Sequence, residues 1–289
     1  METSELLKKV RQIEIKTRGL SNNIFAGQYH SAFKGRGMAF SEVREYQFGD
    51  DTRDIDWKVT ARYVRPYVKV FEEERELTVM LLIDVSGSKD FGTVSQMKRD
   101  VTTEIAATLA FSAIQNNDKI GVIFFSDKIE KFIPPQKGRR HILYIIRELI
   151  DFRPDDRQTD INQALKYLTN AIKKRCTAFL LSDFIDRGNY RDALTIANRK
   201  HDIVAIQVYA RRETELPAVG LMKVRDAETG QERWIDSSTK RVREAYRTWW
   251  DKRQAEMNAA FQKSRIDAVS IRTEDDYVKA LLALFDKRN

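Results

Sequence analysis

The stretch LTVMLLIDVSGSKDFG, residues 77–92, begins as an apolar run and ends in acid and hydroxyl side chains. The run finishes at Asp84, and Ser86 and Ser88 follow at alternate positions. Carboxylate and hydroxyl oxygens grouped in this way suit a hard cation, although short Asp/Ser segments also form ordinary turns. A metal site, unlike a turn, needs further oxygen ligands at the same end of the same sheet.

Two later residues are expected to reach that end. Asp183 ends the apolar stretch TAFLLSD, and Thr159 lies just before the helical stretch INQALKYLTNAIKK, which leads back into the Asp183 strand. Sites in parallel sheets form in the loops beyond the carboxyl ends of the strands. The structural alternative is that Thr159 only caps the helix. We predict one metal site built from Asp84, Ser86, Ser88, Thr159 and Asp183.

Oxygen ligands without a neighbouring histidine or thiolate favour Mg²⁺ or Mn²⁺ over zinc. The hydroxyl groups would bind the ion directly, while Asp84 and Asp183 would orient them through hydrogen bonds or bound waters. Neutral ligands leave the charge of the ion largely uncompensated, so the ion would attract a carboxylate from another molecule. This is the chemistry of a docking site.

The middle of the chain alternates between strand-like and helical stretches. Continuous Val/Ile/Leu runs, such as those in 77–84 and 202–210, are separated by helical stretches of ten or more residues. Strands that are apolar on both faces imply a mainly parallel sheet covered by helices on each side. We therefore predict an α/β fold with a doubly wound, Rossmann-like sheet. The strands KIGVIFFSD and KIEKFIPP are an exception, because a tight turn at Ser126–Lys128 joins them directly.

Two domains are predicted: an N-terminal extension of mixed structure over 1–76, and the α/β domain over 77–289, with a hairpin insertion near 221–236. A long helix after the hairpin is expected to turn five apolar positions inward, namely Val242, Tyr246, Trp249, Met257 and Phe261. Thr273 and Asp276 have the spacing of a capping box before a closing helix.

The 289 residues carry a formal net charge of +8. Acidic residues interrupt most of the sequence around the basic clusters, which favours solvated faces of helices and loops over a nucleic-acid groove. Nucleic-acid binding is kept as a third hypothesis, and it predicts a steep salt dependence of binding.

Cys176 is the one cysteine of the chain, so no intrachain disulfide can form, as expected in a reducing compartment. It precedes the apolar stretch TAFLL, and we expect a packed and unreactive thiol. No stretch approaches the roughly 20 apolar residues that span a bilayer. We expect a soluble, cytoplasmic protein.

A second acidic cluster contains Asp50, Asp51, Asp54 and Asp56. An EF-hand counted from Asp50 would need glycine and glutamate where the chain has Ile55 and Ala61, so this calcium motif is excluded. We expect these acids to pair with the interleaved bases Arg44, Arg53, Lys58 and Arg62.

Motifs of the common enzyme classes are missing: the sequence has neither a GxxxxGK[ST] loop nor a GxSxG elbow. Its three histidines are far apart, and nothing in the sequence indicates a Ser-His-Asp or Cys-His site. The alternative function is a metal-dependent hydrolase, in which the same ion acts as a Lewis acid on a phosphate or acyl group. Asp160 and Asp183 are the obvious acids to serve as its base. We favour the hypothesis that the protein is not an enzyme.

The segment DVSGS, together with Thr159 and Asp183, resembles the metal-ion-dependent adhesion site of von Willebrand factor A domains. The resemblance covers residues 77–210. It implies a Rossmann-like sheet and metal-dependent protein–protein binding, in which an acidic residue of the partner completes the shell of the ion.

Two further segments, GRGMAFSEVREYQFGDDTRDIDWKVTAR at 35–62 and RTEDDYVKALLALFDKR near the C-terminus, resemble a bacterial family of unknown function, domain family 58. Proteins of this kind are typically encoded beside a MoxR-type AAA+ ATPase, so the resemblance implies such an ATPase as a candidate partner in assembly, chaperone-like or regulatory tasks. Many relatives carry N-terminal membrane helices, whereas none is expected in this chain.

Overall fold

The computed structural model describes residues 11–13, 29, 32, 38–63, 65–73, 77–87, 97–152, 158–186, 188–225 and 231–288. The chain divides into two compact units. Met1–Ala32 and Thr78–Asn289 form the larger unit, and Phe33–Leu77 forms the smaller one. The predicted site residues that the structure describes all belong to the larger unit.

The larger unit is built around a sheet in which six strands, among the described residues, follow the order β10-β7-β6-β3-β4-β5. Its strands are β3 (Thr78–Asp84), β4 (Lys119–Phe125), β5 (Ile129–Gln136), β6 (Thr177–Ser182), β7 (Asp202–Tyr209) and β10 (Asp267–Arg272). All neighbouring pairs are parallel except β4 and β5, which pair antiparallel across the predicted tight turn. The predicted fold class, a doubly wound and mainly parallel sheet, is confirmed.

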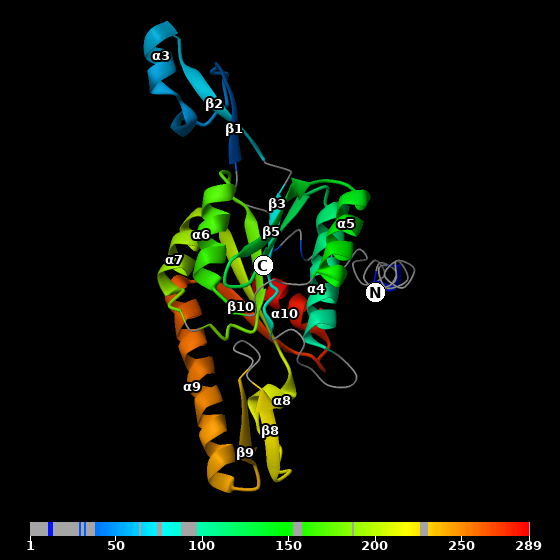
Figure 1. The fold of residues 1–289 in the computed structure, drawn as a ribbon. Coiled ribbons are helices and arrows are strands. Elements are labelled where there is room, and N and C mark those ends of the chain that lie inside the picture. The colour runs from blue at the N-terminus through cyan, green and yellow to red at the C-terminus, as the bar shows by residue number, and fades with distance from the viewer. Residues whose placement is uncertain are drawn as a thin grey trace. The chain divides into compact units, whose positions relative to one another are not determined.

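Helices cover both faces of this sheet (Figure 1). The long helices of the unit are α4 (Lys98–Gln115), α5 (Arg139–Asp151), α6 (Ile161–Ala171), α7 (Arg191–Lys200), α9 (Lys240–Ser264) and α10 (Tyr277–Arg288). Helices α6 and α7 lie on one face, with the C-terminal half of α9 beside α7, and α4 and α5 lie on the other (Figure 1). A sheet covered in this way must be apolar on both faces, which explains the continuous apolar runs.

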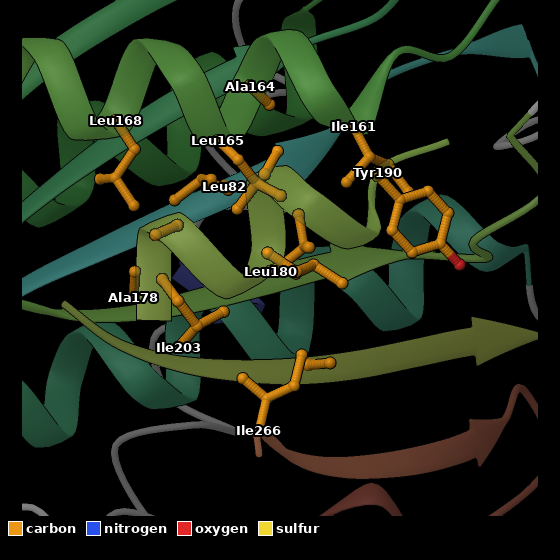
Figure 2. Packing of buried hydrophobic residues seen from close by; sticks show 14 of the residues in the cluster. Leu82, Ile161, Ala164, Leu165, Leu168, Ala178, Leu180, Tyr190, Ile203 and Ile266 are labelled. Atoms are coloured by element: carbon orange, nitrogen blue, oxygen red, sulfur yellow. The ribbon is translucent and has the colours of Figure 1, made fainter. Parts of the chain in front are cut away.

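Alternate residues of the central strands supply the two halves of the core. Leu82 and Leu180 point into a cluster with Leu165 of α6 and Ile203 of β7 (Figure 2). Phe179, one position before Leu180, belongs to the opposite face, where it stacks on Tyr29 at a centroid distance of 6.4 Å. Tyr29 in turn meets the ring of Phe285 in α10 edge-on. Described residues from both ends of the chain therefore pack on one face of the sheet.

Strand β5 is an edge strand of the sheet. Near its end it contains Pro134 and Pro135, which lack the N–H group that donates hydrogen bonds between strands. Gly121 of β4 faces this strand closely, because a Cβ atom at position 121 would lie 2.8 Å from the carbonyl oxygen of Ile133. The close approach of the two backbones requires glycine at this position.

A projection follows β7. It contains the short helix α8 (Arg211–Thr214) and the antiparallel strands β8 (Leu221–Arg225) and β9 (Glu232–Asp236), which lie beside the first half of α9 (Figure 1). Of the two adjacent tryptophans in α9, Trp250 points inward, with 6% of its surface exposed, whereas Trp249 is 42% exposed. The predicted inward position of Trp249 is therefore wrong by one residue.

The closing helix α10 begins without the predicted capping box. The Asp276 carboxylate accepts hydrogen bonds from the N–H groups of Val278 and Lys279, so Asp276 caps the helix. The Thr273 hydroxyl is buried and has no hydrogen-bond partner in the part of the chain that the structure describes.

The smaller unit contains the strands β1 (Met38–Glu45) and β2 (Tyr67–Glu73), the 3₁₀ turn η1 (Thr52–Asp54) and the helix α3 (Trp57–Tyr63). β1 and β2 pair antiparallel. The Arg44 guanidinium binds the Asp50 carboxylate with two hydrogen bonds of 2.7 and 2.8 Å, and Arg53 binds Asp51. These pairs agree with the prediction that the acidic cluster has a structural role.

No helix within the described ranges combines the length and apolar character that crossing a membrane requires.

Candidate functional site

Asp84, the last residue of β3, is held in place by contacts within the protein. Asp84 is buried, and one of its carboxylate oxygens accepts a hydrogen bond of 2.9 Å from the Ser86 N–H group. The other oxygen accepts a hydrogen bond of 2.6 Å from the Ser182 hydroxyl at the end of β6. Asp84 therefore joins two adjacent strands at their carboxyl ends and fixes the start of the Ser86 loop.

Asp183 follows β6 at the same edge and is also buried. One carboxylate oxygen accepts a hydrogen bond of 3.0 Å from the Ile185 N–H group. The other lies 2.8 Å from the Nζ atom of Lys98. Both carboxylates of the predicted site thus lie where the sequence places them, and both orient neighbouring groups.

Lys98, at the start of α4, is a residue that sequence reasoning missed. Only 3% of its surface is exposed, and its ammonium group also lies 2.6 Å from a carboxylate oxygen of Glu213 in α8. Glu213 accepts a second hydrogen bond from the Ala210 N–H group, and its carbonyl accepts one from the Tyr246 hydroxyl of α9. A buried ammonium shared by two carboxylates therefore links α4, the end of β6 and the projection.

Thr159 lies in the loop before α6, and two contacts tie this loop to the same edge. The Asp160 N–H group donates to the carbonyl of Ser126, directly after β4. The Ile161 N–H group donates to the carboxylate of Asp186, in the loop after β6. The segments around Asp84, Thr159 and Asp183 therefore meet at one end of the sheet.

The Thr159 hydroxyl itself is buried and has no hydrogen-bond partner among the residues that the structure describes. It does not cap α6, because that role belongs to Asp160, whose carboxylate accepts a hydrogen bond of 2.9 Å from the Gln163 N–H group. A buried hydroxyl without a partner costs about 1–3 kcal/mol. Such a cost is offset if the oxygen serves as a ligand.

Ser88, the fifth predicted ligand, lies outside the described residues.

Burial dominates the electrostatics of this edge. It raises the pKa of the Asp84 carboxyl to about 6, and the nearby charge of Asp183 adds to the rise. It also raises the pKa of Glu213, which Lys98 only partly counteracts. Burial alone would lower the pKa of Lys98, but the adjacent carboxylates of Asp183 and Glu213 outweigh this effect, so the pKa of Lys98 is raised. The ammonium therefore stays charged, while one carboxyl group titrates close to neutrality.

Among the described residues, the carboxyl groups of Asp84, Asp183 and Glu213 lie near one ammonium group, that of Lys98. A cavity of about 20 Å³ lies between Asp84, Asp183 and Lys98, room for about one water molecule. Carboxylates gathered in this way would favour a divalent cation close by.

These features fit a site of hard oxygen ligands. The Thr159 hydroxyl, which has no partner within the described ranges, and the buried hydroxyl of Ser86 are oxygen ligands of the kind that Mg²⁺ and Mn²⁺ accept. The carboxylate oxygens of Asp84 and Asp183 contact neighbouring protein groups. Carboxylates of this kind can orient the residues that bind a metal ion without binding it themselves. Within the described ranges, no three His, Cys, Asp or Glu side chains gather as a metal-binding group. The donor set is therefore rich in hydroxyls.

The structure also brings one cysteine and one histidine together, away from this edge. Cys176, before β6, and His201, before β7, lie 3.2 Å apart and are both buried. Burial raises the pKa of the Cys176 thiol to about 12 and lowers the pKa of His201 to about 4. Both groups are held neutral, so this pair lacks the thiolate of a cysteine nucleophile.

Comparisons with known proteins agree with the sequence resemblance. A family model described as a protein of unknown function, DUF58, matches residues 42–256. An uncharacterized protein of Mycobacterium tuberculosis is 30% identical over 232 residues, which are 80% of this chain and 73% of that protein.

Two solved structures show a similar arrangement. The conserved hypothetical protein BatB from Bacteroides thetaiotaomicron is 16% identical, with a TM-score of 0.49, over 73% of this chain and 98% of that one. The VWA domain of SpRpn10 is 11% identical, with a TM-score of 0.39, over 73% of this chain and 95% of that one.

Proposed function

The chain belongs to the DUF58 family of proteins of unknown function, and on that premise we propose that it is a divalent-metal-dependent protein-interaction module. The metal is Mg²⁺ or Mn²⁺, held by the hydroxyls of Ser86 and Thr159, with Ser88 as a third ligand outside the described residues. Asp84 and Asp183 orient these groups. The bound ion supplies an electrophilic contact for an acidic side chain of a partner protein.

The observation that carries this proposal is the Thr159 hydroxyl. It is buried at the carboxyl edge of the sheet without a partner in the described part of the chain, although Asp160 already caps the adjacent helix. The buried carboxyl groups of Asp84 and Asp183 at the same edge support a cation there.

The module is proposed to bind a partner and not to catalyse a reaction. Of the two acids considered as the base of a hydrolase, Asp183 uses both carboxylate oxygens for contacts with Ile185 and Lys98, and Asp160 caps α6 through one oxygen. A general base needs a free oxygen within reach of the proton that it removes. The hydrolase hypothesis keeps the same metal site, and a screen of phosphate and acyl esters with Mg²⁺ tests it directly.

The partner proposed from the sequence resemblance is a MoxR-type AAA+ ATPase, and the compartment is the cytoplasm. A pull-down from bacterial lysate, with Mg²⁺ or with a chelator, identifies proteins that are released with the metal. Retention of the same proteins in both conditions would contradict metal-dependent binding.

Calorimetric titration with MgCl₂ and MnCl₂ tests the metal site itself. We expect wild-type protein to bind at least one of the two ions, and Thr159→Val to weaken the affinity at least tenfold, because loss of a residue that only orients the ligands already costs about 10–100-fold. The substitution keeps the shape of the side chain and removes a hydroxyl that makes no described hydrogen bond, so folding is expected to be unaffected.

Thr273→Val is the matched control, since Thr273 is also a buried threonine whose hydroxyl lacks a partner within the described ranges. It follows β10, two strands from β6 in the sheet. Its metal affinity is expected to equal that of wild type. The metal site is ruled out if wild-type protein gives no heat with either ion at millimolar concentration, or if the two variants behave alike.

A further inference from the structure

A second cavity lies in the projection, apart from the hydroxyls of the metal site. It has a volume of about 440 Å³ and lies between α8 and the first turn of α9. This volume is within the range of about 300–1,000 Å³ that is usual for small-molecule sites. Charged walls are formed by Arg211, Arg212, Arg243 and Glu215, and Leu216 and Pro217 provide apolar surface.

The charges on these walls do not balance, because three guanidinium groups face one carboxylate. Arg211 and Glu215 are 3.8 Å apart, and both side chains are more than half exposed, so this pair is weak. Arg212 has neither an ion pair nor a side-chain hydrogen bond within the described ranges. The cavity therefore carries positive charge that no described group offsets.

Arg243 differs from the other two arginines because the backbone fixes its position. Its Nη1 atom donates hydrogen bonds of 2.7 Å to the carbonyls of Ser237 and Ser238, which follow β9. The remaining N–H groups of its planar guanidinium are held at the cavity wall before any ligand arrives. Preorganised donors of this kind lose little conformational entropy on binding.

We propose that this cavity binds a small anionic molecule that carries a carboxylate or phosphate group. Guanidinium groups bind such planar or tetrahedral oxyanions through paired, charge-assisted hydrogen bonds. The apolar surface of Leu216 and Pro217 would contact the carbon skeleton of the ligand. The site is independent of the proposed metal, although Arg211 and Arg212 directly precede Glu213, which holds Lys98.

Calorimetric titrations with sodium phosphate and with sodium succinate test this proposal at low ionic strength, with protein that has been treated with a chelator and then dialysed into metal-free buffer, so that neither the metal site nor the chelator plays a part. We expect wild-type protein to bind at least one probe, and Arg212→Ala to weaken that binding at least tenfold. Binding of phosphate alone assigns a phosphate-bearing ligand, and binding of succinate alone assigns a carboxylate.

Arg247→Ala is the matched control, because Arg247 is an exposed arginine one helical turn after Arg243 and does not line the cavity. Its affinity for the probe is expected to equal that of wild type. Thermal unfolding of both variants checks that the projection remains folded. The proposal is overturned if wild-type protein binds neither probe at millimolar concentration, or if Arg247→Ala weakens binding as much as Arg212→Ala.

Discussion

Acidic and basic side chains meet at similar distances in two regions of the molecule, with different surroundings. At the carboxyl edge of the large sheet, Lys98 lies 2.6 and 2.8 Å from Glu213 and Asp183, and 4% of its side chain is exposed. In the smaller unit, Arg44 lies 2.7 Å from Asp50, and the two side chains are 37% and 21% exposed.

Burial, more than contact distance, decides how much an ion pair contributes to the structure. Water solvates the Arg44 pair almost as well apart as together, so the pair contributes little to the free energy of unfolding. Lys98, Asp183 and Glu213 are shielded from water, so each charge is stabilised mainly by the opposite charges beside it. These buried contacts can therefore fix the positions of the side chains at the carboxyl edge, whereas the exposed Arg44–Asp50 pair mainly stabilises a local turn.

The largest predicted effect comes from removing the buried cation. Lys98→Met leaves the carboxylates of Asp183 and Glu213 without their ammonium, and we expect the free energy of unfolding to fall by about 3–5 kcal/mol. Urea denaturation measures this loss. The double variant Lys98→Met/Glu213→Gln should recover part of it, because one of the stranded charges is then removed.

Lys131→Met is the control for this comparison. Lys131 lies 2.6 Å from Glu148, but the two side chains are 36% and 23% exposed. We expect a much smaller loss of stability than for Lys98→Met. Equal losses in the two variants would show that burial does not separate these pairs.

An intermediate effect is expected from the buried but neutral pair of Cys176 and His201. The pKa of His201 is about 4 in the folded protein, against an ordinary value of 6.5, because burial disfavours the imidazolium. The unfolded chain therefore binds a proton that the folded chain does not, and stability is lost as the pH falls below 6.5. Between pH 7 and pH 5 the expected loss from this group is about 2 kcal/mol.

Urea denaturation of wild type and of His201→Asn at both pH values measures this contribution. The variant should lose less stability than wild type as the pH falls. A pH dependence that is unchanged in His201→Asn would contradict this assignment.

The smallest effect is expected at the exposed pair. Arg44→Ala removes two short hydrogen bonds to Asp50, yet water replaces them at once, so thermal unfolding should change little. Any change should shrink further in high salt, which screens exposed charges. A large loss of stability that resists salt would mean that Arg44 is buried in solution.

Much of this fold could be predicted because its sheet is buried on both faces. The apolar runs of β3, β6 and β7 have no polar face, and this pattern is specific to covered parallel sheets. The inward face of a helix is harder to predict. Exchanging Trp249 for Trp250 turns the inward direction by about 100°, and each tryptophan alone satisfies the apolar pattern.

Site residues that directly follow strands can be predicted from the sequence. A site residue whose burial depends on a partner far along the chain cannot. Asp84 and Asp183 end apolar runs, so the topology alone brings them to one edge. Lys98 is different, because its burial depends on Glu213, which is 115 residues later in the chain. A lysine in the first turn of a predicted helix is usually solvated, and nothing local identified it as an exception.

The two prolines that end β5 also limit how this protein can associate. An edge strand with free N–H groups can add a strand from another chain, in register, and so extend the sheet. Neither Pro134 nor Pro135 has an N–H group, so this part of the edge strand lacks a donor for an added strand. A second chain is therefore poorly accommodated as an added strand there, which protects the protein from edge-to-edge aggregation at high concentration.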